Sequence, residues 1–169
     1  MANGDTIDQD FVFAYGSNLN RHDLSLWASK NGHTFDECVL EYIPAYLPKY
    51  KLIWNYLSST RRGGAANIEP APNSLVYGAM LRVSKKGLLL LDEKEGHPMR
   101  YNRGTERIPC LTHKEKKEIH CWVYAVLPQL CENFSVRPTD DYLAIVLRGI
   151  QDQGFCPDIQ KSLKTSVPN

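Results

Sequence analysis

The sequence lacks an excess of charge of either sign, with 20 Lys and Arg residues against 19 Asp and Glu residues in 169 positions. Binding to nucleic acid or to an anionic membrane through the overall field of a protein needs a basic surplus, and no basic run interleaved with aromatic residues replaces it here. No stretch approaches the ~20 apolar residues that a membrane helix requires. We therefore expect no nucleic-acid partner, no membrane partner, and a small molecule as the ligand.

Cysteine and histidine are sparse, with five residues of each, and neither follows a pattern that signals chemistry. The cysteines are odd in number and contain no C-x-x-C pair, which is typical of reduced thiols in a cytoplasmic protein. The histidines lack the spacing of metal ligands, so we expect no metal. Residues 1–10 are polar and lack the cationic start and apolar stretch of a secretory signal, which also favours a cytoplasmic location.

The length suits one domain with a core of its own, and we expect residues 1–10 to form a loose leader and residues 11–164 a single domain. Short apolar segments separated by turn residues about every ten positions predict an α+β fold. In this fold a small curled or barrel-like mixed β-sheet carries helices on its outside. The expected strands cover residues 11–13, 38–40, 50–54, 65–68, 75–83, 100–108 and 119–126.

Proline and glycine refine these expectations. Pro44 and Pro48 cannot donate to a ladder, so they predict sheet edges or connections around them. The composition of residues 70–74 predicts a turn between two strands. Gly78, inside an expected strand, predicts a bulge or the close approach of a neighbouring backbone.

Four helices are expected. An amphipathic helix begins near Leu19 and ends near residues 31–32. Ser84 is a typical N-cap for a helix over residues 85–95, and Gly96 is a typical residue to end it. Thr139 can cap a helix that continues to about Gly149, and a shorter helix follows Pro157.

The apolar segment at residues 11–14 leads directly into a tight polar turn. Gly16, Ser17 and Asn18 have the composition that lets a backbone direct several N–H groups into a cavity, an arrangement that binds anions. From composition alone a plain β-turn with satisfied polar side chains is favoured. This turn is nevertheless the best candidate for a ligand site.

Glu95 is the candidate for acid–base chemistry. In the expected helix it lies on one stripe with Leu88 and Leu91, which would direct it toward the sheet. A carboxyl group at the C-terminal end of a helix lies near the negative end of the macrodipole, where taking up a proton is favoured. Four consecutive leucines blur the stripe, so periodicity also leaves Glu93 open. A solvated glutamate is the alternative for Glu95, and we expect its neighbours Asp92, Glu93 and Lys94 to be solvated.

Several segments, taken in order, resemble the gamma-glutamylcyclotransferase-like family. Two short motifs carry most of the resemblance: Tyr15, Gly16, Ser17, Asn18 and Leu19 after an apolar strand, and residues 91–96 followed by Tyr101. Residues 63–68 and 76–79 are similar to linking strands of the family, and residues 138–163 are similar to its closing helices. The resemblance covers roughly residues 11–164.

The resemblance implies the family's barrel-like fold and an intramolecular aminolysis without a cofactor. The α-amine of a γ-glutamyl group attacks its own γ-carbonyl, which releases 5-oxoproline and a free amine or amino acid. Glu95 is the implied general base and acid. The implied substrate-binding residues are Tyr15, Gly16, Ser17, Asn18, Leu19, Tyr101 and Tyr124, although Tyr124 could equally belong to the core. The protein would be a monomer or a homodimer.

The identity of the substrate stays open at this point, because residues 96–100 differ from the corresponding loop of the family. A γ-glutamyl amino acid or peptide is ranked first, and a γ-glutamylamine or a carrier-bound γ-glutamyl group second. A non-catalytic binding module on the same fold is a further alternative. A serine or thiol hydrolase is disfavoured, since Ser17 lacks the G-x-S-x-G elbow and no cysteine lies in a recognisable Cys–His setting.

Overall fold

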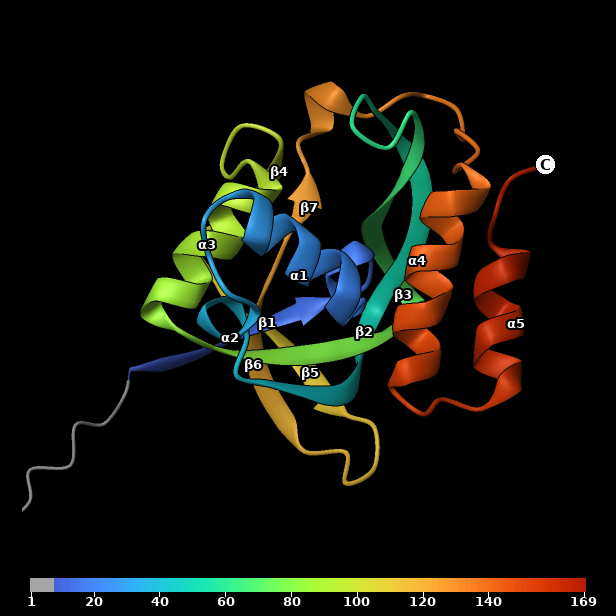
Figure 1. Cartoon of the computed structure of the whole chain (residues 1–169). Coiled ribbons are helices and arrows are strands. Elements are labelled where there is room, and N and C mark those ends of the chain that lie inside the picture. The colour runs from blue at the N-terminus through green and yellow to red at the C-terminus, as the bar shows by residue number, and fades with distance from the viewer. Residues whose placement is uncertain (1–7) are drawn as a thin grey trace, which may run out of the picture.

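The computed structural model describes residues 8–169 and contains a closed five-stranded β-barrel with helices outside it (Figure 1). The strand order is β1-β3-β2-β5-β6, and β1 closes the barrel by pairing antiparallel with β3 and parallel with β6. The strands are β1 (Gln9–Ala14), β2 (Glu41–Ser58), β3 (Gly63–Ser84), β5 (Ile108–Thr112) and β6 (Glu118–Val123). A separate two-stranded sheet pairs β4 (Tyr101–Asn102) with β7 (Ala125–Val126). The expected α+β fold with a barrel-like mixed sheet is confirmed.

The first strand begins earlier than the sequence predicted. Residues 1–7 of the expected leader lie outside the described residues, while Gln9 and Asp10 belong to β1. Asp10 is held there by Arg107 and by the indole N–H of Trp122, which donates to its carboxylate over 2.8 Å. These contacts explain why a polar residue can start a barrel strand.

The prediction that Pro44 and Pro48 mark edges or connections is wrong, because both lie within β2, which pairs with β3 and β5. The carbonyl of Pro44 accepts from the N–H of His113 on the β5 side, so its missing N–H also faces that side. The β2–β5 ladder contains only the pairs at Ala45 and Tyr46. The prolines therefore remove no hydrogen bond to β3.

Residues 70–74 do not separate two strands, because β3 runs through them as one long strand. Pro48 pairs with Leu75 and Tyr50 pairs with Pro70, so the intervening residues 71–74 leave the ladder opposite Lys49, whose φ is 66°. The residues that predicted a turn thus form an irregular stretch within the long β2–β3 hairpin. Gly78 does meet a neighbouring backbone, since a Cβ there would lie 2.0 Å from the carbonyl oxygen of Ala14.

Three other expected strands are absent, shorter than predicted or divided: residues 38–40, 100–108 and 119–126. Residue Cys38 ends a short helix, α2 (Phe35–Cys38), which begins with a capping box between Thr34 and Glu37. The expected strand 100–108 reduces to β4, because the chain turns where the N–H of Gly104 (φ 67°) donates to the side chain of Asn102. The expected strand 119–126 is divided into β6 and β7.

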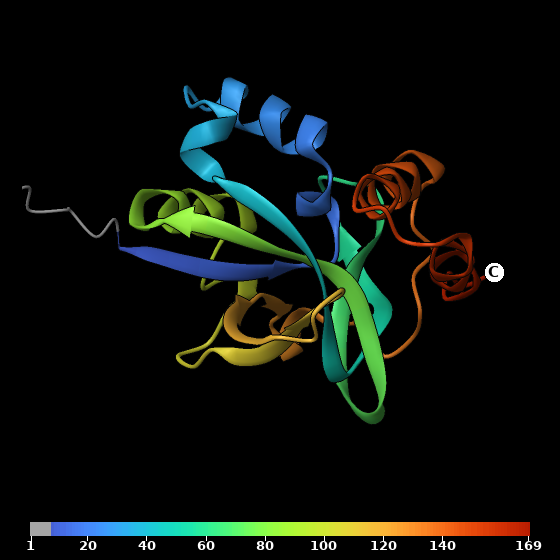
Figure 2. The ribbon, with the colours of Figure 1, turned by 90° about the horizontal axis from the view of Figure 1, so that it is seen from below.

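The expected helices are present and surround the barrel (Figures 1 and 2). Ser84 caps α3 (Lys85–Glu95) by accepting from the N–H of Gly87 over 3.0 Å, and Gly96 ends it with φ 68°. Thr139 caps α4 in the same way. The remaining elements are η1 (Ser17–Leu19), α1 (Arg21–Lys30), η2 (Pro128–Leu130), α4 (Asp140–Asp152) and α5 (Pro157–Thr165).

The core has two parts, on opposite faces of β1. Val12 packs in a cluster that includes Leu24 of α1 and Leu91 of α3, whereas its neighbour Phe13 packs in a cluster with Met80 and with Val146 of α4. The end of β1 therefore lies between both groups of helices. Among residues 8–169, no helix is both long enough and apolar enough to cross a membrane.

Candidate active site

The turn after β1 is fixed by contacts from distant parts of the chain. The buried Tyr15 hydroxyl donates to the carbonyl of Tyr124 over 2.6 Å. The hydroxyl of Tyr42 donates to the carbonyl of Asn18 over 2.7 Å. Within residues 8–169, the N–H groups of Ser17 and Asn18 at the start of η1 have no acceptor. The turn thus offers two backbone donors in a rigid frame.

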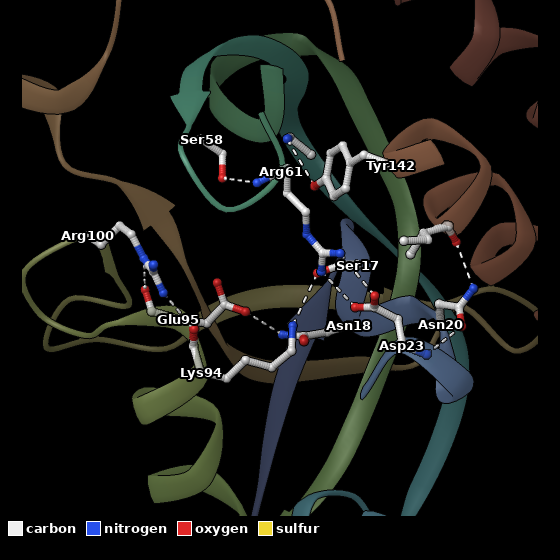
Figure 3. Close-up of polar contacts among 12 residues, drawn as sticks. Ser17, Asn18, Asn20, Asp23, Ser58, Arg61, Lys94, Glu95, Arg100 and Tyr142 are labelled. Atoms are coloured by element: carbon white, nitrogen blue, oxygen red, sulfur yellow. Dashed lines mark hydrogen bonds and ion pairs between the residues drawn. The ribbon is translucent and has the colours of Figure 1, made fainter. Parts of the chain in front are cut away.

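Glu95 and this turn meet although they are 77 positions apart in the sequence. The side-chain N–H₂ of Asn18 donates to Glu95 Oε1 over 2.8 Å (Figure 3). Asn18 is only 7% exposed, and its Oδ1 has no hydrogen-bond partner among the described residues. The structure therefore places a carboxylate beside a buried amide oxygen that is free to accept from a ligand.

Two adjoining cavities meet at Glu95. A recess of about 40 Å³ lies over the end of β1, and a cleft of about 480 Å³ opens between α1, the β2–β3 turn and the end of α3. The recess is lined by aromatic rings and by the turn itself. Four residues line both cavities: Ser17, Glu95, Tyr101 and Tyr142.

An irregularity in the β2–β3 ladder creates the floor of the recess. Ile53 pairs with Asn67 and Tyr56 pairs with Ala65, which leaves the backbone of Ala66 outside the ladder. Its carbonyl accepts from the Tyr101 hydroxyl over 2.8 Å, and its N–H donates to the Tyr142 hydroxyl over 3.3 Å. Both phenols are thereby positioned by one residue of the strand.

The tyrosines of the site stay protonated at neutral pH. Burial raises the pKa of Tyr101 well above its usual value and raises that of Tyr142 to about 12. Tyr101 was expected to offer its phenol to a substrate or to Glu95, but its proton is directed at Ala66. Tyr142 was missed as a site residue. No local signal marked Tyr142, because its place at the site depends on how α4 packs on the barrel.

Tyr124 lines the recess, but its hydroxyl is already engaged. It donates to Asp92 Oδ1 over 2.6 Å, and Arg103 holds both oxygens of the same carboxylate at 2.8 and 3.0 Å. Asp92 was expected to be solvated, yet its side chain is only 13% exposed. Burial would raise the pKa of Asp92, but the hydrogen bonds from Arg103 and Tyr124 outweigh burial and lower it.

Leu19, an expected substrate-binding residue, is fully buried and lines neither cavity. A Cβ added at Gly149 of α4 would lie 2.5 Å from Leu19 Cβ. Leu19 therefore serves to dock η1 on α4. Leu19, the last residue of the motif, is therefore a core residue that packs against its neighbours.

The wall of the cleft opposite Glu95 carries an ion pair. Arg61 binds both carboxylate oxygens of Asp23 at 3.0 and 2.8 Å, and its guanidinium lies 5.3 Å from the ring centroid of Tyr142. Arg61 thereby joins α1 to the β2–β3 turn, as Figure 3 shows.

Lys94 and Arg100 surround the end of α3. Lys94 was expected to be solvated, but it is partly buried, lines the cleft and donates from Nζ to Ser17 Oγ over 3.2 Å. Arg100 donates to the carbonyls of Glu95 and Lys94 over 3.1 and 2.8 Å, which satisfies the last carbonyls of the helix. Glu93 is exposed at the rim of the cleft.

In the part of the chain that the structure describes, no three His, Cys, Asp or Glu side chains are grouped to hold a metal ion.

The structure thus combines a closed barrel with a carboxylate between a small recess and an open cleft. Comparisons with known proteins identify the family. The family model for gamma-glutamyl cyclotransferase, AIG2-like, matches residues 12–144, and the chain belongs to this family. The human gamma-glutamylcyclotransferase is 31% identical over 162 residues, and the bovine protein of the same name is 29% identical over 161. Each match covers 93% of this chain and 78% of the relative.

Solved structures show the same fold. A gamma-glutamyl cyclotransferase structure superposes with a TM-score of 0.75 at 27% identity, covering 96% of this chain and 90% of the other. A yeast gamma-glutamyl cyclotransferase specific to glutathione gives a TM-score of 0.58 at 11% identity, covering 95% of this chain and 97% of the other. The second likeness concerns the fold alone. The protein is an enzyme of the gamma-glutamylcyclotransferase type.

Proposed function

We propose that this protein cyclises the γ-glutamyl group of a γ-glutamyl amino acid or peptide, releasing 5-oxoproline and the free amino acid or peptide. The observation that carries the proposal is the contact between Asn18 and Glu95 at the junction of the recess and the cleft. The recess would hold the γ-glutamyl group and the cleft would hold the part that leaves. Glu95 would then lie beside the bond that breaks.

Glu95 would move the protons that this reaction requires. The α-amine of the substrate is an ammonium ion in solution and becomes a nucleophile only after it loses one proton to solvent. As the neutral amine bonds to the γ-carbonyl carbon, Glu95 would take a second proton from the attacking nitrogen and pass it to the leaving nitrogen while the old C–N bond breaks. The released amine would then take up a proton from solvent. One carboxylate suffices, because both nitrogens are bonded to the same carbon in the tetrahedral intermediate.

The turn would orient the γ-glutamyl group. The unpartnered Oδ1 of Asn18 is suited to accept from the α-ammonium group next to the base. The N–H groups of Ser17 and Asn18 are suited to bind a carboxylate or the oxyanion of the intermediate, a contact worth ~3 kcal/mol in other oxyanion sites. At Gly16 a Cβ would come within 3.4 Å of the Tyr142 hydroxyl, so a side chain there would narrow the recess.

The aromatic walls would force the glutamyl chain to fold. Tyr15, Tyr101, Tyr124 and Tyr142 line the recess, and each hydroxyl is fixed by a hydrogen bond within the protein. A rigid, confined pocket favours the bent conformer in which the amine approaches its own γ-carbonyl. We therefore propose that Tyr101 and Tyr124 contact substrate mainly through their rings.

Replacement of Glu95 tests the proposal. Glu95→Gln keeps the shape of the side chain but cannot take a proton, so 5-oxoproline release at saturating substrate should fall about 10²- to 10⁴-fold, the usual range for acid–base catalysis. Binding of substrate, measured by calorimetry, should change little. Glu93→Gln, two residues away at the exposed rim, is the matched control and should stay near wild-type activity. Activity retained in Glu95→Gln, or lost in Glu93→Gln, would contradict the assignment.

A further inference from the structure

Among the cations that line the cleft, Arg61 and Arg100 have fixed partners within the protein, and Lys30 is exposed on α1. Arg61 is held by both oxygens of Asp23, and Arg100 donates to two backbone carbonyls. Lys94 differs from them. Among residues 8–169, the only hydrogen bond of the Lys94 side chain goes to the hydroxyl of Ser17. No carboxylate in that range lies within 4.0 Å of Lys94 Nζ. A partly buried ammonium group thus faces the cleft without a counter-ion.

The position of Lys94 relative to Glu95 is set by the turn. The two residues follow each other at the end of α3, and their side chains bind successive residues of η1: Nζ of Lys94 contacts Ser17, and Oε1 of Glu95 contacts Asn18 (Figure 3). Glu95 lines both cavities, whereas Lys94 lines only the larger cleft. Lys94 therefore lies on the side of Glu95 that we assign to the leaving group.

The chemistry of the leaving group matches this position. In a γ-glutamyl amino acid, the nitrogen that leaves is bonded to the carbon that carries the α-carboxylate. When that nitrogen lies at Glu95, the carboxylate falls in the adjacent part of the cleft. We propose that Lys94 binds the α-carboxylate of the departing amino acid and so makes the enzyme select γ-glutamyl amino acids over γ-glutamylamines; the inference rests on the proposed function.

The electrostatic environment supports an anion at this place. Burial lowers the pKa of Lys94, and the nearby Arg61 and Arg100 act in the same direction, while Glu95 and Asp23 oppose the shift. The ammonium group is thus poorly compensated in the unliganded protein. A bound carboxylate would replace the lost hydration and form a charge-assisted hydrogen bond.

Two substrates that differ only in the carboxylate test the inference: γ-glutamyl-L-alanine and γ-glutamylethylamine. For Lys94→Gln, kcat/KM for γ-glutamyl-L-alanine should fall about 10- to 100-fold, the range for a hydrogen bond to a charged group, mainly through KM. For γ-glutamylethylamine it should change less than about threefold. Lys94→Arg, which keeps the charge, should recover part of the preference. Lys85→Gln, at the exposed start of the same helix, should leave both values unchanged.

The outcomes distinguish the role of Lys94 from the proposed cyclisation activity. An equal loss on both substrates would overturn the assignment, because it would place Lys94 at the γ-glutamyl group that they share. Unchanged values for both substrates would overturn it as well. If the wild-type protein released no 5-oxoproline from either compound, the proposed function itself would fail, and the carboxylate site with it.

Discussion

At the scale of single residues, the side-chain amide of Asn18 has two different tasks. Its N–H₂ group holds Glu95, and its buried oxygen has no hydrogen-bond partner among the described residues. An unpaired buried oxygen is destabilising, by roughly 1–3 kcal/mol in general. A protein keeps such a group where a ligand satisfies it, which is why Asn18 is as informative about the site as Glu95.

The substitution Asn18→Asp tests this double role. Two carboxylates at the 2.8 Å separation of the present contact cannot both stay ionised, so they would share a proton and deprive the site of its base. We expect turnover at neutral pH to fall by about 100-fold or more, within the range of lost acid–base catalysis. Asn73→Asp, on the exposed bulge of β3, is the control. Steady-state kinetics near wild type for Asn18→Asp would show that Asn18 does not position Glu95.

At the scale of elements, α3 is anchored to the barrel by the carboxylate of Asp92, one turn before Glu95. Arg103 and Tyr124 bind this carboxylate from the segments around β4 and β7. The side chains of Asp92 and Arg103 are 13% and 17% exposed, so the pair is shielded from salt. The end of α3, and with it Glu95, is thereby fixed against the aromatic wall of the recess.

This anchor predicts a pH-dependent stability. The pKa of folded Asp92 lies below its ordinary value of 3.8, so its contribution is complete at pH values above 3.8 and is lost as the pH falls through the folded-state pKa. Asp92→Asn should lower the free energy of unfolding by about 2 kcal/mol at pH 7, as expected for hydrogen bonds to a charged group. The difference from wild type should shrink in acid below about pH 4. Urea unfolding at several pH values measures it, and a constant difference would argue against the anchor.

Sequence reasoning succeeded for elements with local signals and failed for those decided by distant partners. The Ser84 cap and Gly96 define α3 within a few residues, so its bounds could be predicted. The continuity of β2 through Pro44 could not be predicted, because it depends on which neighbouring strand the position of the missing N–H faces. The resemblance pointed to Glu95 and to the turn. It missed Tyr142 and Lys94, because their relation to the site arises only when α4 and η1 are brought to the barrel.

At the scale of the whole molecule, helix α4 completes a candidate site that begins with the first strand. It contributes Tyr142 to both cavities, and Gly149 lets it approach η1 closely. A Cβ at Gly149 would lie 2.8 Å from the backbone carbon of Leu19. The position of the turn therefore depends on the packing of α4.

Replacing that glycine tests the dependence. Alanine is preferred over glycine inside a helix by about 1 kcal/mol, so Gly149→Ala would stabilise an isolated α4. In the protein the clash with Leu19 should outweigh this gain, lower the melting temperature and reduce 5-oxoproline release together. A melting temperature above that of the wild type would show that α4 and η1 can separate without consequence.

The closure of the barrel also bears on how the protein acquires activity during folding. Val12 of β1 pairs with Trp122 of β6, and Tyr15 binds the carbonyl of Tyr124, 109 positions along the chain. Contacts between residues so far apart in sequence form slowly, because a long loop must close first. During synthesis β1 can pair with β3 first, but its pairing with β6 must wait until most of the chain has been made. A truncated product that ends before β6 would have the base and the turn but no recess around them.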